Sequence, residues 1–410
     1  MLYTVILLIG LCMPSEGLFS GASLQDYIDS FVDVAKYKIE GKLSLNDSSI
    51  GQIWSFFKSK YGRVYSSIEE EKQRLRIFRD HLFYIVESNL KRLSTFELEL
   101  NDFADWTMEE FNSLKKGLIP STSARRELIE DDEDPSIRRS SRKLYQHHYH
   151  PKRLKRNWNR RWIKNKRFLF DWFRDLINGN NKPGQPVTIF DWRTKIAISS
   201  VKNQLKCGCC YALATATIIE TLYAMKTNST TVIEFSAQQI IDCSSNGNNG
   251  CRGGNFPPSV QYLSGQGGKI ATEASYPFAT QKQACKTNGL NEVQLGNIQY
   301  GEIPEGDEKT MAEALVNYGP LFIGLDAESR LFMFYKAGVL QIKNCPTHRK
   351  DMDHAMVVVG YGYDNALKIP YWIIKNSWGT KWGEHGYLRL AKDSGNMCGI
   401  ASMAFYGKLT

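Results

Sequence analysis

Beyond its opening residues, the 410-residue chain lacks any apolar run that approaches the length needed to cross a membrane. The opening run, Leu2 to Met13, is itself too short to span a bilayer, and small residues follow it between Ser15 and Ala22. This pattern predicts a secretory signal at residues 1–22, although no Lys or Arg precedes the run. We therefore expect a soluble product of the secretory pathway, either lysosomal or extracellular.

Cysteine is absent between Cys12 and Cys207, so eight of the nine cysteines lie in the second half of the chain. An oxidising compartment would pair them by geometry, which the sequence does not reveal. A zinc cluster is the alternative, but no Cys-x2-Cys pair recurs and the single histidine near Cys345 is His348. We therefore expect disulfides, no metal site and no cofactor.

Acidic residues are absent from residues 137–170, where the basic charge of the chain is concentrated. This window holds thirteen Lys and Arg residues, whereas the formal charge of the whole chain is +9, so the remainder sums to 9 − 13 = −4. The basic character therefore belongs to this segment and says nothing about the rest of the chain.

Aromatic residues alternate with these charges, among them Trp158, Trp162 and Phe168. A basic, aromatic-rich segment can bind nucleic acid, a sulfated polysaccharide or an anionic membrane. Residues 138–174 are therefore the candidate segment for binding such a polyanion. The alternative, which we favour, is a solvated linker that is removed on maturation. The basic clusters at 153–156 and 164–167 are candidate processing sites.

A cysteine, a histidine and an asparagine stand in motifs that suit covalent catalysis. Cys210 precedes an apolar run with helical spacing, Tyr211 to Lys226. A thiol at a helix N-terminus feels the positive end of the helix dipole, which favours the nucleophilic thiolate. His354 and Asn376 lie downstream and supply a base and an amide that could orient it. Each residue alone is more often structural, whereas the three in this order indicate a catalytic site.

The Cys-Gly-Cys-Cys-Tyr sequence at residues 207–211 resembles the active-site signature of the papain family of cysteine proteases, on its cathepsin L-like side. Cys209 departs from the small Ser or Ala of that signature. His354 follows Cys210 by 354 − 210 = 144 residues, within the interval of roughly 130–150 typical of the family. Asn376 follows by 376 − 210 = 166 residues, as a loop insertion near residues 364–369 would produce.

The resemblance continues in residues 52–117, which are charged and helical in pattern. One helical stripe matches the residue types of cathepsin prosegments except at His81, and consists of Glu70, Arg74, Phe78, His81, Ile85 and Asn89. Residues 101–105 resemble the end of a second prosegment motif, in which Glu99 stands in the place of Gly. In the family this segment folds against the enzyme and threads its cleft backwards. The resemblance therefore implies a zymogen that is inhibited by its own prosegment.

The same resemblance implies an α+β, papain-like two-lobed fold preceded by a helical prosegment. Residues from Cys210 to about Leu263 would form a helical left lobe, and short Val-, Ile- and aromatic-rich runs after Val293 an antiparallel, barrel-like right lobe. The expected strands lie at 321–325, 354–363, 371–374, 387–390 and 400–405. The expected divisions are a signal at 1–22, a prosegment at 23–118, a linker or insert at 119–185 and a peptidase domain at 186–410.

The resemblance also implies a role for each residue of the site. Cys210 would attack the peptide carbonyl, and His354 would hold the abstracted proton as one partner of a thiolate–imidazolium pair. Asn376 would fix the direction of the imidazole, and Trp378 would shield their hydrogen bond from water. Gln204 and the backbone N–H of Cys210 would form the oxyanion hole.

Substrate contacts follow by family position. The bare backbones of Gly253 and Gly254 would pair with the substrate strand. The pocket for the second residue before the scissile bond, here called the P2 pocket, would be lined by Phe256, Gly324, Ala355 and Met403. These apolar residues predict an aliphatic or aromatic P2 residue. No His-bearing loop of the kind that blocks the cleft in some relatives stands between Cys251 and Cys285, so an endopeptidase is expected. We also expect a monomer.

By the same resemblance the disulfides would be Cys207–Cys251, Cys243–Cys285 and Cys345–Cys398, which leaves Cys209 and Cys210 free. Two adjacent thiols at a helix start would both have a lowered pKa, so we expect Cys209 to make the enzyme sensitive to oxidants. The alternative is that Cys209 is a small buried stand-in for Ser. Two other classes stay open: a catalytically impaired homologue that acts by binding, and a polyanion-binding protein built around the basic segment.

Overall fold

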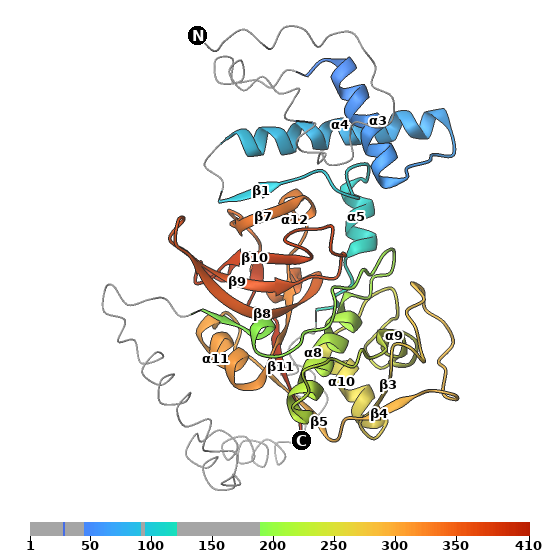
Figure 1. The fold of residues 1–410 in the computed structure, drawn as a ribbon, viewed down its shortest axis with the longest axis vertical. Helices are drawn as coiled ribbons and strands as arrows, with labels where there is room; N and C mark the ends of the chain where they lie inside the picture. Colours follow the sequence, from blue (N-terminus) through green and yellow to red (C-terminus); the bar gives the residue numbers. More distant parts are fainter. Residues whose placement is uncertain (1–27, 29–44, 92–94, 121–188) are drawn as a thin grey trace, which may run out of the picture. The chain divides into compact units, whose positions relative to one another are not determined.

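The computed structural model describes Ile28 and residues 45–91, 95–120 and 189–410 (Figure 1). The described residues up to Ile119 and from Phe190 onward form one compact unit. The expected signal at 1–22, the basic segment, its processing sites and the expected start of the peptidase domain at 186 lie outside the described residues. Among the described residues, no helix is both long and apolar enough to cross a membrane.

The described part of the prosegment consists of the helices α3 (Asp47–Tyr61), α4 (Ile68–Leu90) and α5 (Met108–Lys115) and the short strand β1 (Phe96–Leu98). Side-chain caps define their starts, since Ser67 accepts a hydrogen bond from the backbone N–H of Glu70, and Thr107 and Glu110 form a reciprocal capping box. Helix α4 contains the whole stripe from Glu70 to Asn89, so the helix predicted there is confirmed.

Aromatic packing and an ion pair stabilise the prosegment. Trp54, Phe57 and Phe78 pack with ring centroids 4.9–5.6 Å apart. Arg74 of α4 donates two hydrogen bonds, of 2.6 and 2.7 Å, to the carboxylate of Glu110 on α5. His81, the departure from the family pattern, is buried and lies 3.0 Å through Nδ1 from the carbonyl of Ala104.

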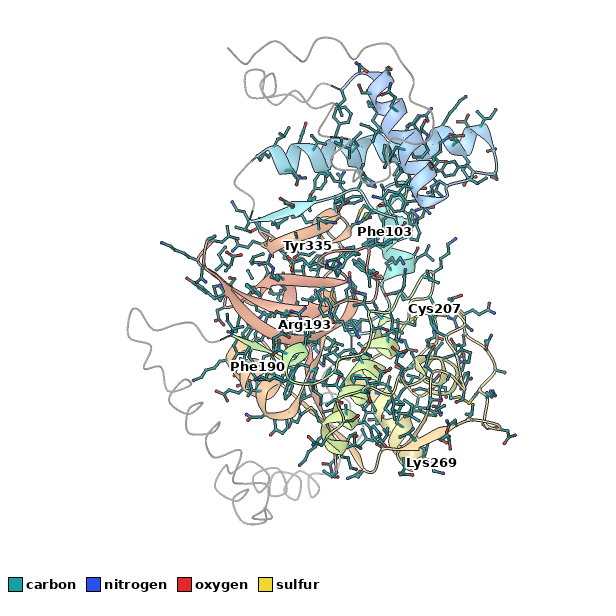
Figure 2. All side chains as sticks on the ribbon, viewed as in Figure 1. Phe103, Phe190, Arg193, Cys207, Lys269 and Tyr335 are labelled. Carbon is teal, nitrogen blue, oxygen red and sulfur yellow. A yellow bond between two sulfur atoms is a disulfide. The ribbon has the colours of Figure 1, made fainter. Side chains whose placement is uncertain are left out.

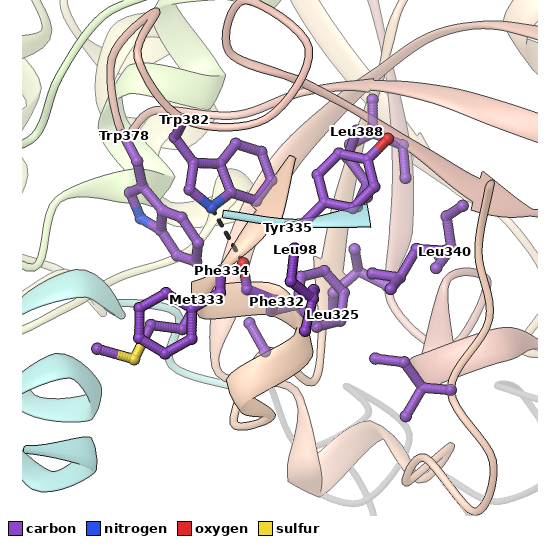
Figure 3. Packing of buried hydrophobic residues seen from close by; sticks show 14 of the residues in the cluster. Leu98, Leu325, Phe332, Met333, Phe334, Tyr335, Leu340, Trp378, Trp382 and Leu388 are labelled. Atoms are coloured by element: carbon purple, nitrogen blue, oxygen red, sulfur yellow. Dashed lines mark hydrogen bonds between the residues drawn. The ribbon is translucent and has the colours of Figure 1, made fainter. Parts of the chain in front are cut away.

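The prosegment extends the β-sheet of the enzyme. Strand β1 pairs antiparallel with β7 (Tyr335–Leu340), and Figure 1 shows the two strands side by side. Asn101 donates through Nδ2 to the carbonyl of Met333, and Leu98 packs in the hydrophobic cluster that contains Phe334 and Trp382 (Figure 3). A shared core of this kind attaches the prosegment through buried apolar area rather than through surface charges alone.

The left lobe is built around α8 (Cys210–Thr227), with α9 (Ala237–Cys243), α10 (Phe256–Gly265) and the hairpin of β3 (Lys269–Ala271) and β4 (Glu292–Gln294). Figure 2 labels Cys207 just before α8 and Lys269 on β3. The expected helical character of this lobe is confirmed. The expectation that α8 is amphipathic is wrong, because its side chains are buried on every face between the two lobes.

The right lobe is a curved sheet whose strands run in the order β1-β7-β10-β9-β8-β6-β11-β5, with β2 (Phe190–Asp191) added beside β8. Its remaining strands are β5 (Ile298–Glu302), β6 (Leu321–Leu325), β8 (His354–Asp364), β9 (Ile369–Lys375), β10 (Tyr387–Ala391) and β11 (Ala404–Leu409). All pairings are antiparallel except that of β10 with β7. Helices α11 (Glu308–Tyr318) and α12 (Arg330–Met333) and three 3-10 turns complete it, at Trp192–Thr194, Arg349–Asp351 and Met397–Gly399.

Four of the five expected strands are confirmed in place, and the fifth is displaced. Residues 400–403, expected to begin a strand, precede β11, which runs from Ala404 to Leu409 instead. Strands β5 and β7 were not expected. Helix α8 packs against β8, so the first residues of a helix from one lobe and of a strand from the other meet at the interface of the lobes (Figure 1).

Candidate active site

Cys210 and His354 are the first residues of α8 and of β8, and both side chains are fully buried in this zymogen conformation. The Sγ of Cys210 accepts a hydrogen bond of 3.3 Å from the backbone N–H of Ala355, the neighbour of His354. Nδ1 of His354 has no hydrogen-bond partner among the described residues, so the imidazole is not bonded to the thiol in this conformation. Catalytic hydrogen bonds often tighten only when substrate is bound.

The other side of His354 is held firmly. Its Nε2 lies 2.8 Å from Oδ1 of Asn376, and the same oxygen accepts the backbone N–H of Ser377 at 2.7 Å. Because Oδ1 of Asn376 is an acceptor, Nε2 of His354 carries the proton of the neutral ring. Nδ1 is then unprotonated and can accept a proton. Trp378 stacks on the imidazole with ring centroids 4.7 Å apart and an angle of 27° between the planes. The indole of Trp378 thus lies against the ring that bonds Asn376, and its shielding role stays a prediction.

Burial keeps both reacting groups neutral in this conformation. It raises the pKa of the Cys210 thiol to about 12, and it lowers the pKa of His354 to about 3 despite the hydrogen bond with Asn376. The expectation of a thiolate at the start of α8 is therefore wrong for the zymogen, because desolvation under the prosegment outweighs the helix dipole. A thiolate–imidazolium pair requires that the cleft be opened to water.

Cys209 also differs from expectation. Its side chain is completely buried, it caps α8 without a side-chain hydrogen bond, and burial raises the pKa of its thiol well above the usual value. The expected lowering of the Cys209 pKa is therefore wrong in this conformation. A buried neutral thiol is the behaviour of a small apolar side chain, which favours the stand-in for Ser over the reactive thiol.

The side chain of Gln204, six residues before Cys210, is fully buried. Its Nε2 donates to the carbonyl of Cys207 at 3.0 Å, and its Oε1 accepts from the hydroxyl of Ser377 at 2.9 Å. These bonds fix the amide between the segment before α8 and the segment after Asn376. One N–H of Nε2 remains for another acceptor.

Residues after α5 fill the cleft above these groups. The backbone N–H groups of Gly117 and Leu118 both donate to the carbonyl of Asp353, at 3.1 and 3.0 Å. Gly254 donates to the carbonyl of Gly117 at 3.0 Å and accepts from Ile119 at 2.9 Å, which makes a parallel bridge with Leu118. Gly254 thus pairs with a strand in the way expected for a substrate, and the strand present is the prosegment.

The glycine pair explains this close approach. A side chain on Gly253, whose φ is +112°, would be strained and would meet the side chain of Ile119 at 3.0 Å. A Cβ on Gly254 would stand 2.3 Å from Oδ1 of Asn248. Glycine at 253 therefore leaves room for the bound strand, whereas glycine at 254 allows the backbone to pack closely on Asn248 of the enzyme.

The side chain of Leu118 occupies the expected P2 pocket. It is buried in one cluster with Met352, Ala355 and Met403, and it lies against Gly324. Phe256 belongs to the same cluster, but its ring packs on Phe322 and Phe405, in the core behind the pocket.

Two residues of this region were missed from the sequence. Met352 approaches the position of a Gly324 Cβ at 3.2 Å, and Asn255 donates through Nδ2 to the carbonyl of Ile119 at 2.8 Å and contacts Sδ of Met403 at 3.3 Å. Asn255 directly follows the glycine pair, and Met352 stands two residues before His354. Their proximity to motif residues was the signal that could have identified them.

A buried ion pair fixes the prosegment beside the histidine. Lys116 binds Asp353 at 2.6 Å and Glu328 at 3.2 Å. Burial raises the pKa of Asp353 to about 6, although the Lys116 ammonium opposes the rise. Next to this pair, the indole N–H of Trp378 donates to the carbonyl of Lys115 at 3.1 Å. The prosegment therefore contacts the neighbours of His354 on two sides.

Six cysteines are paired, in the combinations Cys207–Cys251, Cys243–Cys285 and Cys345–Cys398. The first of these ties the segment before α8 to the segment that leads into Gly253, and so joins two segments of the left lobe. Cys209 and Cys210 are free.

The sequence and the fold both have recognisable relatives. The profile of papain family cysteine proteases matches residues 187–408, and that of the cathepsin propeptide inhibitor domain (I29) matches residues 54–111. The chain is 33% identical over 358 residues to digestive cysteine proteinase 2 of Homarus americanus, a match that covers 86% of this chain and 93% of the relative. The chain belongs to the papain family of cysteine proteases.

Other members of the family share the arrangement of prosegment and enzyme. Cathepsin L1 of Drosophila melanogaster is 32% identical over 357 residues, which cover 86% of this chain and 84% of the relative. The solved structure of digestive procathepsin L 3 from the larval midgut of Tenebrio molitor matches with a TM-score of 0.64 and 30% identity, over 88% of this chain and 99% of that one. The recombinant stem bromelain precursor matches with a TM-score of 0.67 and 28% identity, over 88% and 99%.

This papain-family protease is therefore a cysteine protease made as a zymogen, with a papain-like α+β fold and a helical prosegment of the cathepsin type. The expected family, fold class and enzyme class are confirmed. Peptides are its substrates, and the prosegment is its intramolecular inhibitor.

Proposed function

We propose that Cys210 is the nucleophile of this protease and that His354 is its general base and acid. The observations that support the assignment are that Asn376 and Trp378 fix the ring of His354, that its Nδ1 has no partner among the described residues, and that the backbone N–H of the adjacent Ala355 donates to Sγ of Cys210. Once the prosegment leaves, water reaches the cleft, the pKa of the thiol falls and that of the imidazole rises. The proton then passes from Sγ to Nδ1, and the resulting ion pair stabilises both charges.

In acylation the thiolate attacks the peptide carbonyl, and His354 delivers its proton to the leaving amine. Asn376 stays neutral and keeps the ring direction through its Oδ1. The second N–H of Gln204 Nε2 and the backbone N–H of Cys210 face the developing oxyanion in this proposal. Loss of one such donor costs about 2.7–4 kcal/mol of transition-state stabilisation in comparable sites.

The P2 pocket is proposed to select an aliphatic or aromatic residue. Leu118 of the prosegment supports this, since an aliphatic side chain lies against Gly324 and clusters with Met352 and Met403. The pocket residue at position 403 is Met and not an acidic residue, so a basic P2 residue would find no carboxylate partner there. Peptides that differ only at P2 test this: those with Leu or Phe should be cleaved at least tenfold more efficiently than those with Arg.

Maturation is proposed to divide the chain near residue 186, between a prosegment at 23–118 with its linker at 119–185 and a peptidase domain at 186–410. Among the described residues, Ile119 makes the last contact of the prosegment in the cleft and β2 of the enzyme begins at Phe190, which supports cleavage between them. A secretory route to a lysosomal or extracellular destination is proposed from the apolar run at residues 2–13 and from the three disulfides.

Turnover by single variants tests the assignment of the nucleophile. Activated wild-type protein should hydrolyse the Leu-P2 peptide, Cys210→Ala should show none, and Asn376→Ala should retain activity reduced by about tenfold or more. Substantial turnover by Cys210→Ala, processed in trans so that its prosegment is removed, would contradict the proposal.

A further inference from the structure

Three consecutive residues of the prosegment, Lys116, Gly117 and Leu118, follow the cleft in the order of three substrate positions. The side chain of Leu118 occupies the P2 pocket. Gly117 lies on the segment that leads into Cys210, because a Cβ on Gly117 would stand 2.1 Å from the carbonyl oxygen of Gly208. Gly117 thus takes the place of the residue just before the scissile bond. Lys116 then takes the place of the residue just after that bond, here called P1′.

The side of the cleft that receives Lys116 is also the side of the catalytic base. The carbonyl of Lys115 accepts the indole N–H of Trp378 at 3.1 Å, and Trp378 stacks on His354. Burial lowers the pKa of His354 to about 3, and the nearby ammonium of Lys116 adds to this effect. Because His354 would deliver its proton to the leaving amine, the residue that carries this amine, P1′, is bound on the same side.

The ammonium of Lys116 lies between two carboxylates of the enzyme. Its Nζ donates to Oδ2 of Asp353 at 2.6 Å and to Oε1 of Glu328 at 3.2 Å. The side chain of Asp353 is 23% exposed and that of Glu328 is 67% exposed, so the first forms the inner wall of this site and the second its rim. We call these two groups the P1′ carboxylates. Both belong to the peptidase domain and remain when the prosegment is removed.

The position of Asp353 does not depend on the prosegment. Its Oδ1 accepts the backbone N–H of Ala327 at 3.0 Å, and its own N–H donates to the carbonyl of Leu325 at 3.0 Å. Its Oδ2, by contrast, bonds only Lys116 among the described residues. Departure of the prosegment therefore leaves a fixed acceptor in the cleft whose present partner is an ammonium group.

The charge at this position favours a cation in the active enzyme as well. Burial raises the pKa of Asp353 to about 6, so its carboxyl group is ionised in most molecules at pH 7. Asp326 also faces Asp353, but burial raises its pKa too, and its charge is not needed here. In the active ion pair the thiolate of Cys210 offsets the imidazolium of His354. The P1′ carboxylates therefore determine the sign of the local charge.

We propose that the mature enzyme prefers a basic residue at P1′, whose cationic group is bound by Asp353 and Glu328 in the place of the Lys116 ammonium. The proposal rests on the proposed function and extends its substrate to an apolar P2 residue with a cation directly after the scissile bond. The alternative is that the P1′ carboxylates serve only to hold the prosegment.

The test uses acid-activated protein assayed at pH 7 and peptides with Leu at P2 that differ only at P1′, which is Lys, norleucine or Glu. Norleucine has the stem of Lys without its ammonium group, so the ratio of kcat/KM for the two peptides isolates the charge. Wild type should cleave the Lys peptide about tenfold more efficiently than the norleucine peptide, the gain expected from one hydrogen bond between charged groups. The Glu peptide should be cleaved least efficiently.

Two substitutions at the rim assign this preference to its residues. Glu328→Gln should reduce the ratio to about threefold or less, because Asp353 alone remains. Glu328→Lys should abolish the preference, because it supplies an ammonium group that can itself bind Asp353. The matched control Glu305→Gln removes an exposed carboxylate elsewhere and should keep the wild-type ratio. Since each ratio compares two peptides on one protein, incomplete folding or activation of a variant cancels.

Equal cleavage of the Lys and norleucine peptides by wild type would overturn the proposal and leave the P1′ carboxylates as a tether for the prosegment. An undiminished preference in Glu328→Lys would place the cation elsewhere and overturn it as well. The proposed catalytic assignment fails by a different result, turnover in Cys210→Ala, which does not enter the ratio of Lys to norleucine.

Discussion

The side chain of Leu118 occupies the space that a methyl group on Gly324 would fill. The Cδ2 atom of Leu118 lies 2.5 Å from the position of a Cβ at Gly324, so the leucine of the prosegment and the glycine of β6 fit each other closely. This contact links inhibition to substrate selection, because the same pocket receives the prosegment in the zymogen and, as we propose, the P2 residue in the mature enzyme.

Gly324→Ala is expected to weaken both uses of the pocket. Overpacking of a filled site costs about 1–3 kcal/mol, so we expect the precursor to show at least about fivefold more activity at neutral pH before any acid treatment. The mature variant should lose more kcat/KM on a peptide with Phe at P2 than on one with Val. Gly265→Ala is the matched control, since nothing lies within 4 Å of a Cβ there. Equal leakage from both variants would show that the P2 contact does not hold the prosegment.

The stability of the prosegment is expected to decrease as the pH is lowered, because Glu110 becomes protonated. Its pKa is lowered, first by the hydrogen bonds from Arg74 and then by the cap at Thr107. A carboxylate with a lowered folded-state pKa contributes stability above its unfolded pKa of about 4.3, and this stability is lost as the pH falls through the folded value. Because the pair is about a third exposed, we expect a contribution of about 1 kcal/mol or less.

Glu110→Gln should therefore shift the onset of precursor activation to higher pH and flatten its dependence on acid. Activation would be followed by the rate of product formation after incubation at a series of pH values, with Glu109→Gln, an exposed neighbour in the same helix turn, as control. Asp105 does not act in this way, since burial raises its pKa. An unchanged pH profile in Glu110→Gln would show that the Arg74–Glu110 ion pair does not contribute to activation by acid.

Cys209→Ser is expected to keep most of the activity of the mature enzyme. The thiol of Cys209 is buried without a hydrogen bond to the catalytic residues, and a serine is of similar size. Hydrogen peroxide should inactivate wild type and Cys209→Ser at similar rates if Cys209 is only a packing residue. A clear gain in oxidant tolerance in Cys209→Ser would restore the reactive interpretation that follows from its position beside Cys210.

The basic segment is expected to act before maturation only. If residues 138–174 bind polyanions, a heparin column should retain the precursor and release it as salt rises, because such binding depends on counterion release. The mature form that begins near residue 186 should pass through. Retention of both forms at the same salt concentration would place the binding surface on the enzyme.

The strands of the right lobe could be predicted where the sequence is continuously apolar. β6 and β8 are buried along almost their whole length, which gives the unbroken runs that were recognised. β5 and β7 each carry exposed or half-exposed residues in their middle, so neither shows a continuous run or a clean alternation. They are strands because of their neighbours in the sheet rather than because of their own pattern.

The site residues could be located from motif spacing, but their protonation could not. The motif around Cys210 contains no information on the desolvation that Lys115 to Leu118 impose, since these residues lie about ninety positions earlier in the chain. The same holds for α8, whose apolar spacing predicts one buried face although the two lobes cover all of them. A short stretch of sequence does not reveal burial that is caused by distant parts of the chain.

The most direct test of the account is covalent labelling of the thiol by a reactive epoxide, followed by peptide mapping. We predict a single label on Cys210 in acid-activated protein, no label in the intact precursor at neutral pH, and none in activated Cys210→Ala or His354→Ala. Label on Cys209 with Cys210 unmodified, or activated protein that hydrolyses peptides without taking up any label, would contradict the assignment of Cys210 as the nucleophile.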